Sequence, residues 1–270
     1  SPTERYRGDA MQILRRHQIP WIDDSEDGSK GSGLMHHKFL VIDTQRVITG
    51  SANFSNSGMH GDPAAIQTRG NVNHLLCFNS TELAELFKKE FLLMWGDGPG
   101  GAKDSLFGLA KNAPGIQTAK VGGTRIEVLF APHAKRQKMN GLQFIAKQIE
   151  TSKQSIDMAL FIFSAQALVD KLREQVQSGV KIRLIADPGF ASRSYSEVLD
   201  LLGVALPDHR CKLEVGNKPF EVPLEEIGTP RLASGDKLHH KFAVIDNKTV
   251  ITGSFIGSPL PPTPMTKPCW

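Results

Sequence analysis

The chain has little cysteine, and its cysteines lie far apart. Cys77, Cys211 and Cys269 are odd in number and form no Cys-x-x-Cys pair, which argues against a disulfide framework and against a thiolate metal site. Long apolar runs are also missing, since the longest resemble 159–163 and a membrane-spanning helix needs roughly 20 apolar residues. The excess of one sign of charge is small, because the net charge is only +4. A net charge of this size permits an anionic substrate without requiring one.

The composition that is present is typical of a folded domain. Hydrophobic residues make up 40% and charged residues 22% of 270 positions, enough to bury a sizeable core in one large domain or two ordinary ones. The chain opens at Ser1 without a methionine and shows no signal-peptide pattern. We do not expect Ser1 to be the natural start, so the sequence leaves cytoplasmic and exported locations equally open.

A sixteen-residue segment occurs twice, at 36–51 and at 239–254. The two copies differ at four positions, so twelve of sixteen are identical without a gap. Three of the four differences fall at 44–46, where we expect a hairpin turn between two strands. The repeat therefore predicts two similar structural units in one chain.

Hydrophobic periodicity around the repeat predicts alternating strands and helices. The first copy is expected to hold a helix near 11–14, a short strand at 19–20, a strand at 72–78 and a helix at 81–95. The second copy is expected to hold strands at 126–130, 156–163 and 180–186, helices at 142–149, 165–177 and 197–200, and a short strand at 204. This alternation indicates α/β units in which helices flank a sheet.

The repeat also predicts the domain organisation. We expect a first unit at 1–95 that lacks its N-terminal strands, a Gly-rich linker at 96–123, and a second unit at 124–270 that lacks its C-terminal strand and helix. The proline-rich segment 257–270 suits neither strand nor helix. Its back-translation allows an acidic, strand-like segment in another frame, so we interpret it as a frameshift product.

The repeated segment places chemistry-bearing side chains together. Side chains alternate along a strand, so His36 and Lys38 share one face, and His239 and Lys241 share the equivalent face. A lysine holds an anionic oxygen as a point charge, and a neutral imidazole attacks or moves a proton near neutral pH. Two such pairs facing one phosphate suit attack by one imidazole, protonation of the leaving oxygen by the other, and hydrolysis of the phosphohistidine.

The duplicated pattern His-x-Lys-x4-Asp-x6-Gly-Ser resembles the phospholipase D superfamily. The resemblance implies two similar α/β units packed about a pseudo-twofold axis, and phosphodiester cleavage or phosphatidyl transfer through phosphohistidine, without metal or cofactor. It favours His36 as nucleophile and His239 as general acid/base. The catalytic residues that it implies are His36, Lys38, Asp43, His239, Lys241 and Asp246, and the substrate-binding residues are Ser51, Asn53 and Ser254.

The sequence departs from the family pattern in two places. The counterpart of Asn53 in the second copy is Ile256. The family often carries an acidic residue downstream that orients a catalytic histidine, and here Asn73 occupies that place in the first copy. Asn73 is expected to hydrogen-bond an imidazole without stabilising its charged form as a carboxylate does. A catalytically impaired module that binds nucleic acid or phosphate therefore stays open as the alternative function.

Other features have plainer interpretations. His37 and His240 point to the opposite face and are expected to pack, and no zinc site is expected from the His pairs. Asp43 and Asp246 are interpreted as supporting residues, and the acidic loop 23–27 and the Gly-rich 28–33 as solvated connections.

The resemblance to the phospholipase D superfamily leaves two substrate classes open, a phospholipid and a nucleic acid. The segment 208–237 is a candidate apolar rim or lid, and peripheral contact with a membrane is left open. We expect a monomer, because both half-sites lie in one chain.

Overall fold

The computed structural model describes residues 10–24, 35–61, 67–111, 114–133, 137 and 139–255. The segment interpreted as a frameshift product, the loop 28–33 and Ile256 lie outside these residues. Among the helices that are described, none is long and apolar enough to cross a bilayer.

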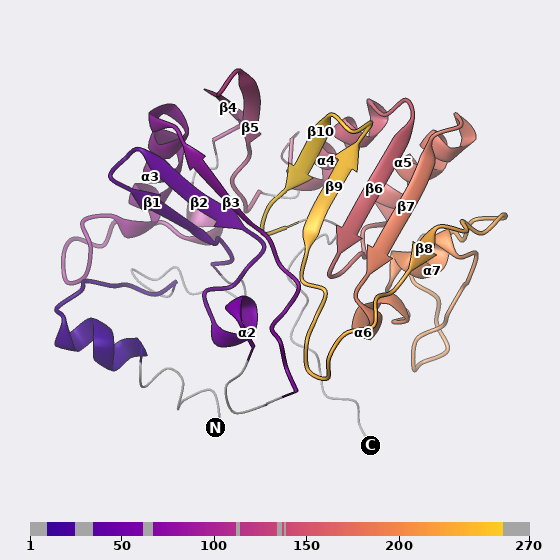
Figure 1. The fold of residues 1–270 in the computed structure, drawn as a ribbon, viewed down its shortest axis with the longest axis horizontal. Coiled ribbons are helices and arrows are strands. Elements are labelled where there is room, and N and C mark those ends of the chain that lie inside the picture. Colours follow the sequence, from indigo (N-terminus) through magenta and orange to yellow (C-terminus); the bar gives the residue numbers. More distant parts are fainter. Residues whose placement is uncertain are drawn as a thin grey trace.

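Two sheets stand side by side, and each carries one copy of the repeat (Figure 1). The first sheet has the order β1-β2-β3 and is antiparallel throughout. Its strands are β1 (Phe39–Ile42), β2 (Arg46–Gly50) and β3 (Leu75–Asn79), followed by α3 (Thr81–Trp95). The predicted hairpin turn forms between β1 and β2, because Ile42 pairs with Arg46.

The second sheet has the order β10-β9-β6-β7-β8 and is mixed: β6 pairs parallel with β7 and antiparallel with β9. The helices α4 and α5 pack against it and enclose a core that includes Ile156, Leu160 and Leu172. The elements of this unit are α4 (Gly141–Glu150), β6 (Ser155–Leu160), α5 (Gln166–Gln177), β7 (Lys181–Ala186), α6 (Pro188–Ala191), α7 (Glu197–Leu201), β8 (Ile227–Gly228), β9 (Lys241–Ile245) and β10 (Thr249–Thr252).

The segment expected to be a linker contains regular structure. It holds a short 3₁₀ helix (Gly108–Ala110) and β4 (Gln117–Val121), which pairs with β5 (Thr124–Val128). Ala119 is fully buried in the cluster that also contains Val47 and Leu83 of the first unit. The boundary expected at residue 124 therefore falls inside a hairpin that packs on the first sheet and α3.

The short strands expected at 19–20 and 204 are absent from the described chain. Residues 10–16 are helical, and the amide of Ile19 donates to the carbonyl of Leu14 at 2.9 Å. The amide of Val204 donates to the carbonyl of Leu199 at the same distance. Both segments thus close the end of a helix with a six-to-one hydrogen bond. Their amides are therefore not available for the hydrogen-bond ladder of a strand.

A short parallel bridge joins the two units. Val72 pairs with Leu238; the amide of Val72 donates to the carbonyl of Lys237 at 2.8 Å, and the amide of His239 donates to the carbonyl of Val72 at 2.9 Å. The carboxylate of Asp236 also accepts the amides of residues 69 and 70. The segment that enters β3 therefore runs beside the segment that enters β9 (Figure 1).

Equivalent positions of the two sheets differ in how well they are covered. Leu40 and Ile42 of β1 are 45% and 37% exposed, whereas their counterparts Ala243 and Ile245 of β9 are 4% and 2% exposed. The reason is that α4 and α5 pack over the second sheet. The corresponding face of the first sheet has no such helices among the described residues.

This difference in cover predicts that substitutions at the two equivalent positions change the free energy of unfolding by unequal amounts. Ala243→Leu overfills a packed core and is expected to lower the free energy of unfolding by about 1–3 kcal/mol. Leu40→Ala, at the equivalent exposed position, is expected to change it by less than about 0.5 kcal/mol. Urea unfolding followed by far-UV circular dichroism measures both, and equal losses in the two variants would contradict the difference in cover.

Candidate active site

The two His-x-Lys pairs meet where the sheets join. His36 and Lys38 directly precede β1, and His239 and Lys241 lie at the start of β9. The charges of both lysines act on each histidine, and His36 also acts on His239. The four side chains, predicted from two distant segments, are therefore close enough to share one site.

Each histidine is held by the opposite repeat. His239 Nδ1 lies 3.1 Å from the carbonyl oxygen of Ser51, and His36 has a backbone hydrogen bond to Ser254. Ser51 and Ser254 are equivalent positions of the repeat, so the exchange is reciprocal. His239 Nδ1 also lies 2.9 Å from Asn73 Oδ1. The acceptor oxygens of Ser51 and Asn73 lie closer to Nδ1 than Lys241 Nζ does at 3.2 Å, so the tautomer with the proton on Nδ1 and the lone pair on Nε2 fits these contacts best.

Both lysines are buried and fixed by their own repeat. Lys38 and Lys241 are 8% and 7% exposed, and their ammonium groups donate to the carbonyls of His36 and His239 at 2.8 and 3.0 Å. Lys241 Nζ also lies 3.2 Å from each ring nitrogen of His239 and 5.2 Å from the centroid of the Phe161 ring. The positive charge is thus placed before any anion arrives.

Burial and mutual repulsion shift the pKa of all four groups downward. Desolvation by the surrounding chain, followed by the charges of Lys38 and Lys241, lowers the pKa of His36 to about 4, although the residue itself is exposed to solvent. Desolvation and Lys241 lower the pKa of His239 to about 3. Desolvation lowers the pKa of Lys38 to about 8, and together with Lys38 it lowers that of Lys241 to about 7.

The site therefore holds two neutral imidazoles beside two crowded ammonium groups. No carboxylate of the described residues forms an ion pair with either lysine. An anion bound between the lysines would relieve their repulsion, and a phosphate diester has the required charge.

The residues expected to contact substrate, and Asn73, which was expected to contact an imidazole, occupy different surroundings. Ser51 is fully buried, and its hydroxyl donates to Asn73 Oδ1 at 2.9 Å, so its contacts are with the groups that hold His239. Asn53 is exposed on the loop after β2, and Ser254 is half-buried directly after β10. Asn73 makes the hydrogen bond to imidazole that was expected of it, and its amide nitrogen donates to Gly58 O at 3.1 Å.

Asp43 and Asp246 do not belong to the site, which corrects their expected place among the catalytic residues. Each lies in the hairpin turn at the far end of its strand with a φ of 52°. The carboxylate of Asp246 accepts the amides of 153, 154 and 155 at 2.7–2.9 Å. A strand rises about 3.3 Å per residue, so five residues carry these carboxylates well away from the lysines.

The neighbouring histidines pack as expected, but with partners that the sequence did not reveal. His240 stacks on His74, with ring centroids 5.3 Å apart and Nδ1 atoms 3.0 Å apart. His74 in turn lies 2.6 Å from Thr252 Oγ1. The sequence offered one signal for the contact of His74 with His240. His74 directly follows Asn73, the position at which the family often carries a residue that orients a catalytic histidine.

His37 is held by a buried carboxylate. Its Nε2 lies 3.0 Å from Glu90 Oε1, and the same oxygen accepts from the ammonium of Lys111. Burial by itself would raise the pKa of Glu90, but the hydrogen bonds from His37 and Lys111 bring it below its ordinary value. The carboxylate therefore stays ionised and ties α3 to the residue next to His36.

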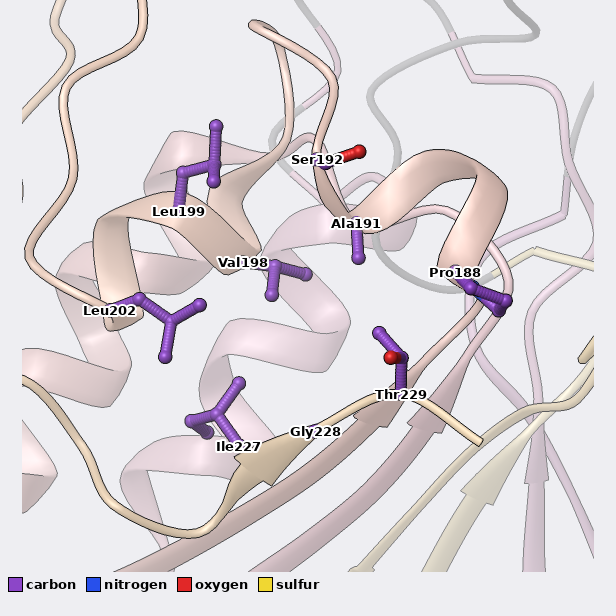
Figure 2. Close-up of a pocket in the computed structure, with 9 residues that line it drawn as sticks. All are labelled: Pro188, Ala191, Ser192, Val198, Leu199, Leu202, Ile227, Gly228 and Thr229. Carbon is purple, nitrogen blue, oxygen red and sulfur yellow. The ribbon is translucent and has the colours of Figure 1, made fainter. Parts of the chain in front are cut away.

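An apolar cavity lies away from the two His-x-Lys pairs. It has a volume of about 330 Å³ and is lined by apolar side chains of α6, α7 and β8, including Val198, Leu199, Leu202 and Ile227 (Figure 2). None of the four catalytic side chains lines it. Phosphate chemistry is therefore assigned to the junction of the two repeats and not to this cavity.

Comparison with protein families agrees with the geometry. A profile described as "Cardiolipin synthase, PLD-like domain" matches residues 2–95 and 145–255, which includes both His-x-Lys pairs. The chain belongs to the phospholipase D superfamily. The two matched regions correspond to the two α/β units, and hairpin β4–β5 lies between them.

Individual relatives match over shorter lengths. "Phospholipase D" of Rickettsia felis is 29% identical over 150 residues, 54% of this chain and 62% of that protein. "Mitochondrial cardiolipin hydrolase" of Mus musculus is 33% identical over 88 residues, 33% of this chain and 34% of that protein. The phosphatidylserine synthase of Haemophilus influenzae aligns in space with a TM-score of 0.45 and 12% identity, over 81% of this chain and 53% of that structure.

The lysine pKa values predict how anion binding depends on pH. As pH rises through 7 and then 8, Lys241 and Lys38 lose their protons, so the site loses the charge that attracts phosphate. A dialkyl phosphate, which stays monoanionic, is expected to bind about tenfold or more weakly at pH 9 than at pH 6. Calorimetric titration measures this affinity and the accompanying proton uptake, and equal affinity at both pH values would contradict it.

The contact between Asn73 and His239 predicts a second effect. Asn73→Asp places a carboxylate 2.9 Å from the ring and is expected to raise the pKa of His239, because a nearby negative charge stabilises imidazolium. An NMR titration of the imidazole measures the shift. Asn79→Asp, in β3 beside Arg46, is the matched control, and a pKa of His239 that moves equally in both variants would contradict the assignment.

Proposed function

We propose that the chain is a phosphodiesterase that acts through a covalent phosphohistidine. The observation that supports this most strongly is the meeting of two neutral imidazoles and two fixed ammonium groups from the two repeats at one site. Membership of the phospholipase D superfamily supports the same class of reaction. No metal is needed in this scheme, because Lys38 and Lys241 already neutralise the phosphate oxygens.

The reaction has two displacements at phosphorus. The lone pair of one imidazole, assigned to His36, forms the N–P bond while the bond from phosphorus to the leaving oxygen breaks. Lys241 protonates His239 at Nε2, and His239 gives that proton to the leaving oxygen. His239 then takes a proton from water and returns it to Lys241, while the water oxygen attacks phosphorus and releases His36 with its electron pair. Another alcohol in place of water would give transfer instead of hydrolysis.

The proton of the acid step is available from Lys241. Its Nζ lies 3.2 Å from His239 Nε2, and its pKa of about 7 makes it a better proton donor than an ordinary lysine. A bound phosphate anion also raises the pKa of His239, because it offsets the lysine charges that lower it. The pair of His239 and Lys241 therefore acts as one acid/base unit.

A phospholipid is the favoured substrate. Met35, Phe54 and Met59 are 47%, 51% and 43% exposed, and the first two directly adjoin His36 and Asn53 in the sequence. Apolar side chains beside a phosphate site suit contact with a lipid surface. The names of the two curated relatives support the same class.

The segment 208–237 is anchored to the second unit, although Val215 and Val222 within it are 97% and 77% exposed. Phe220 is 6% exposed and belongs to the core of the second unit, and Asn217 Nδ2 and Lys218 N donate to Asp200 of α7 at 2.9 and 3.1 Å. These contacts hold the segment against α5 and α7, so its expected role as a lid is not adopted.

The alternative function is a phosphate- or nucleic-acid-binding module without turnover. The amide of Asn73 beside His239 supports it, because an amide does not stabilise imidazolium as a carboxylate does. Trapping of an acid-labile, alkali-stable phosphoryl adduct separates the two functions. The experiment uses phosphorus-labelled phospholipid vesicles and labelled single-stranded nucleic acid in parallel, with EDTA present in both.

Substitution of the histidines tests the shared site. His36→Ala and His239→Ala are each expected to remove turnover almost completely, by roughly a thousandfold or more, and the double variant is expected to be little worse, because groups that act as one unit are not additive. His60→Ala, in the exposed residue after α2 (Asn56–Met59), is the matched control. About half of the activity remaining in each single variant would show two independent sites instead.

A further inference from the structure

The backbone that leads into His239 is held by three different acceptors. The amide of Lys237 donates to Asn71 Oδ1 at 2.9 Å, the amide of Leu238 donates to Asp187 Oδ2 at 2.8 Å, and the amide of His239 donates to Val72 O at 2.9 Å. Two of these acceptors belong to the first repeat. Asp187 is the one that comes from the sheet of the second repeat.

Asp187 is fixed more firmly than its partners. It is fully buried, it follows β7 directly, and its own amide donates to the carbonyl of Leu160 at 3.1 Å. Its second carboxylate oxygen accepts the amide of Gly189 at 2.9 Å and caps α6. Both carboxylate oxygens therefore accept from backbone amides. The hydrogen bond to Leu238 thus fixes the residue before His239 relative to the end of β7.

The first half-site contains the same contact. The amide of Met35 donates to Asp24 Oδ2 at 2.9 Å, and Met35 is the repeat counterpart of Leu238. The two aspartates are not counterparts, because Asp24 follows the helix at 10–16, whereas Asp187 precedes the equivalent helix α7. Two unrelated segments thus deliver a carboxylate to the same backbone amide, directly before each catalytic histidine.

We propose that Asp187 and Asp24 are positioning residues, which set the places of His239 and His36 by holding the preceding amide. Neither carboxylate is a catalytic residue, because each acts through the backbone. This inference rests on the proposed function, in which His36 is the nucleophile and His239 the acid. The consequence is that the two aspartates affect different chemical steps.

Asp187→Asn keeps the shape of the side chain but turns one acceptor into a donor, which then faces a backbone amide. Either the bond to Leu238 or the bond to Gly189 is lost, and His239 is displaced from the leaving oxygen. Because a displacement of about 1 Å costs up to roughly 100-fold in rate, formation of phosphohistidine from a dialkyl phosphate is expected to fall about 10- to 100-fold.

The leaving group reveals which histidine is affected. A p-nitrophenyl ester releases its phenolate without a proton, so its pre-steady-state burst does not need His239. Asp187→Asn is expected to keep this burst within about threefold. Asp24→Asn, at a half-buried position after the helix at 10–16, is expected to slow the burst of both esters about equally, because it displaces the nucleophile.

Asp208→Asn is the matched control. Asp208 also accepts two backbone amides, those of Arg210 and Lys212 at 2.8 and 3.0 Å, but in a loop that makes no contact with the histidines. It is expected to leave both bursts unchanged. An equal loss for both esters in Asp187→Asn, or no loss for either, would overturn the proposal.

Amide exchange measured by NMR gives a readout that does not depend on turnover. In Asp187→Asn the amides of Leu238 and His239 are expected to lose protection, while those of β6 keep it. Unchanged protection at Leu238 would overturn the inference even if the wild-type chain hydrolyses no diester. Absence of a burst in the wild-type chain, with protection lost as expected, would instead contradict the proposed function alone.

Discussion

The parallel contact between 71–73 and 237–239 is the constraint on which the site depends. The contact is short, because the bridge between Val72 and Leu238 is its only β-bridge in the described chain. It nevertheless fixes the register between two sheets that share no other ladder among the described residues. Through it the amide of His239, the side chain of Asn73 and the carbonyl of Ser51 come together. Without this contact each repeat would carry one imidazole and one ammonium, which is half of the chemistry.

The electrostatics follow from that junction. Two ammonium groups are brought into one desolvated space, and each lowers the proton affinity of its neighbours. The packing of the two units offsets this repulsion, since no carboxylate among the described residues pairs with either lysine. The same repulsion favours an anion over a neutral ligand, which is why the packing of the repeats suits the phosphate substrate that we propose.

The sequence predicted the parts of this site that repeat. Identity at twelve of sixteen positions marked the two hairpins, and strand alternation put His36 with Lys38 on one face and His37 on the other, as the ring contacts of His37 with Phe39 confirm. Alternation also made Asp43 a supporting residue, and its place in the turn after β1 agrees with that interpretation more than with the catalytic role that the resemblance implied.

Features formed between distant segments were not predictable. Hydrophobic periodicity predicted the helix at 81–95, but it did not show that Phe91 is 43% exposed while the charged Glu90 is 1% exposed. The explanation is that Glu90 meets His37 and Lys111, and no local pattern shows such partners. The contact of Asp24 with Met35 was missed for the same reason, because an acidic loop is ordinarily solvated.

The two half-sites carry the same His-x-Lys pair but differ in what surrounds them, and this difference suits the two roles that we propose for the histidines. His37 is held by an ionised carboxylate, whereas its counterpart His240 is held by the neutral ring of His74. Asn73 contacts His239, while the described chain offers no equivalent group to His36. A symmetric pair of histidines would have no reason to divide the work of nucleophile and acid. The unrepeated residues around an identical motif provide that reason: they fix the tautomer of His239 and leave His36 open to solvent and to phosphorus.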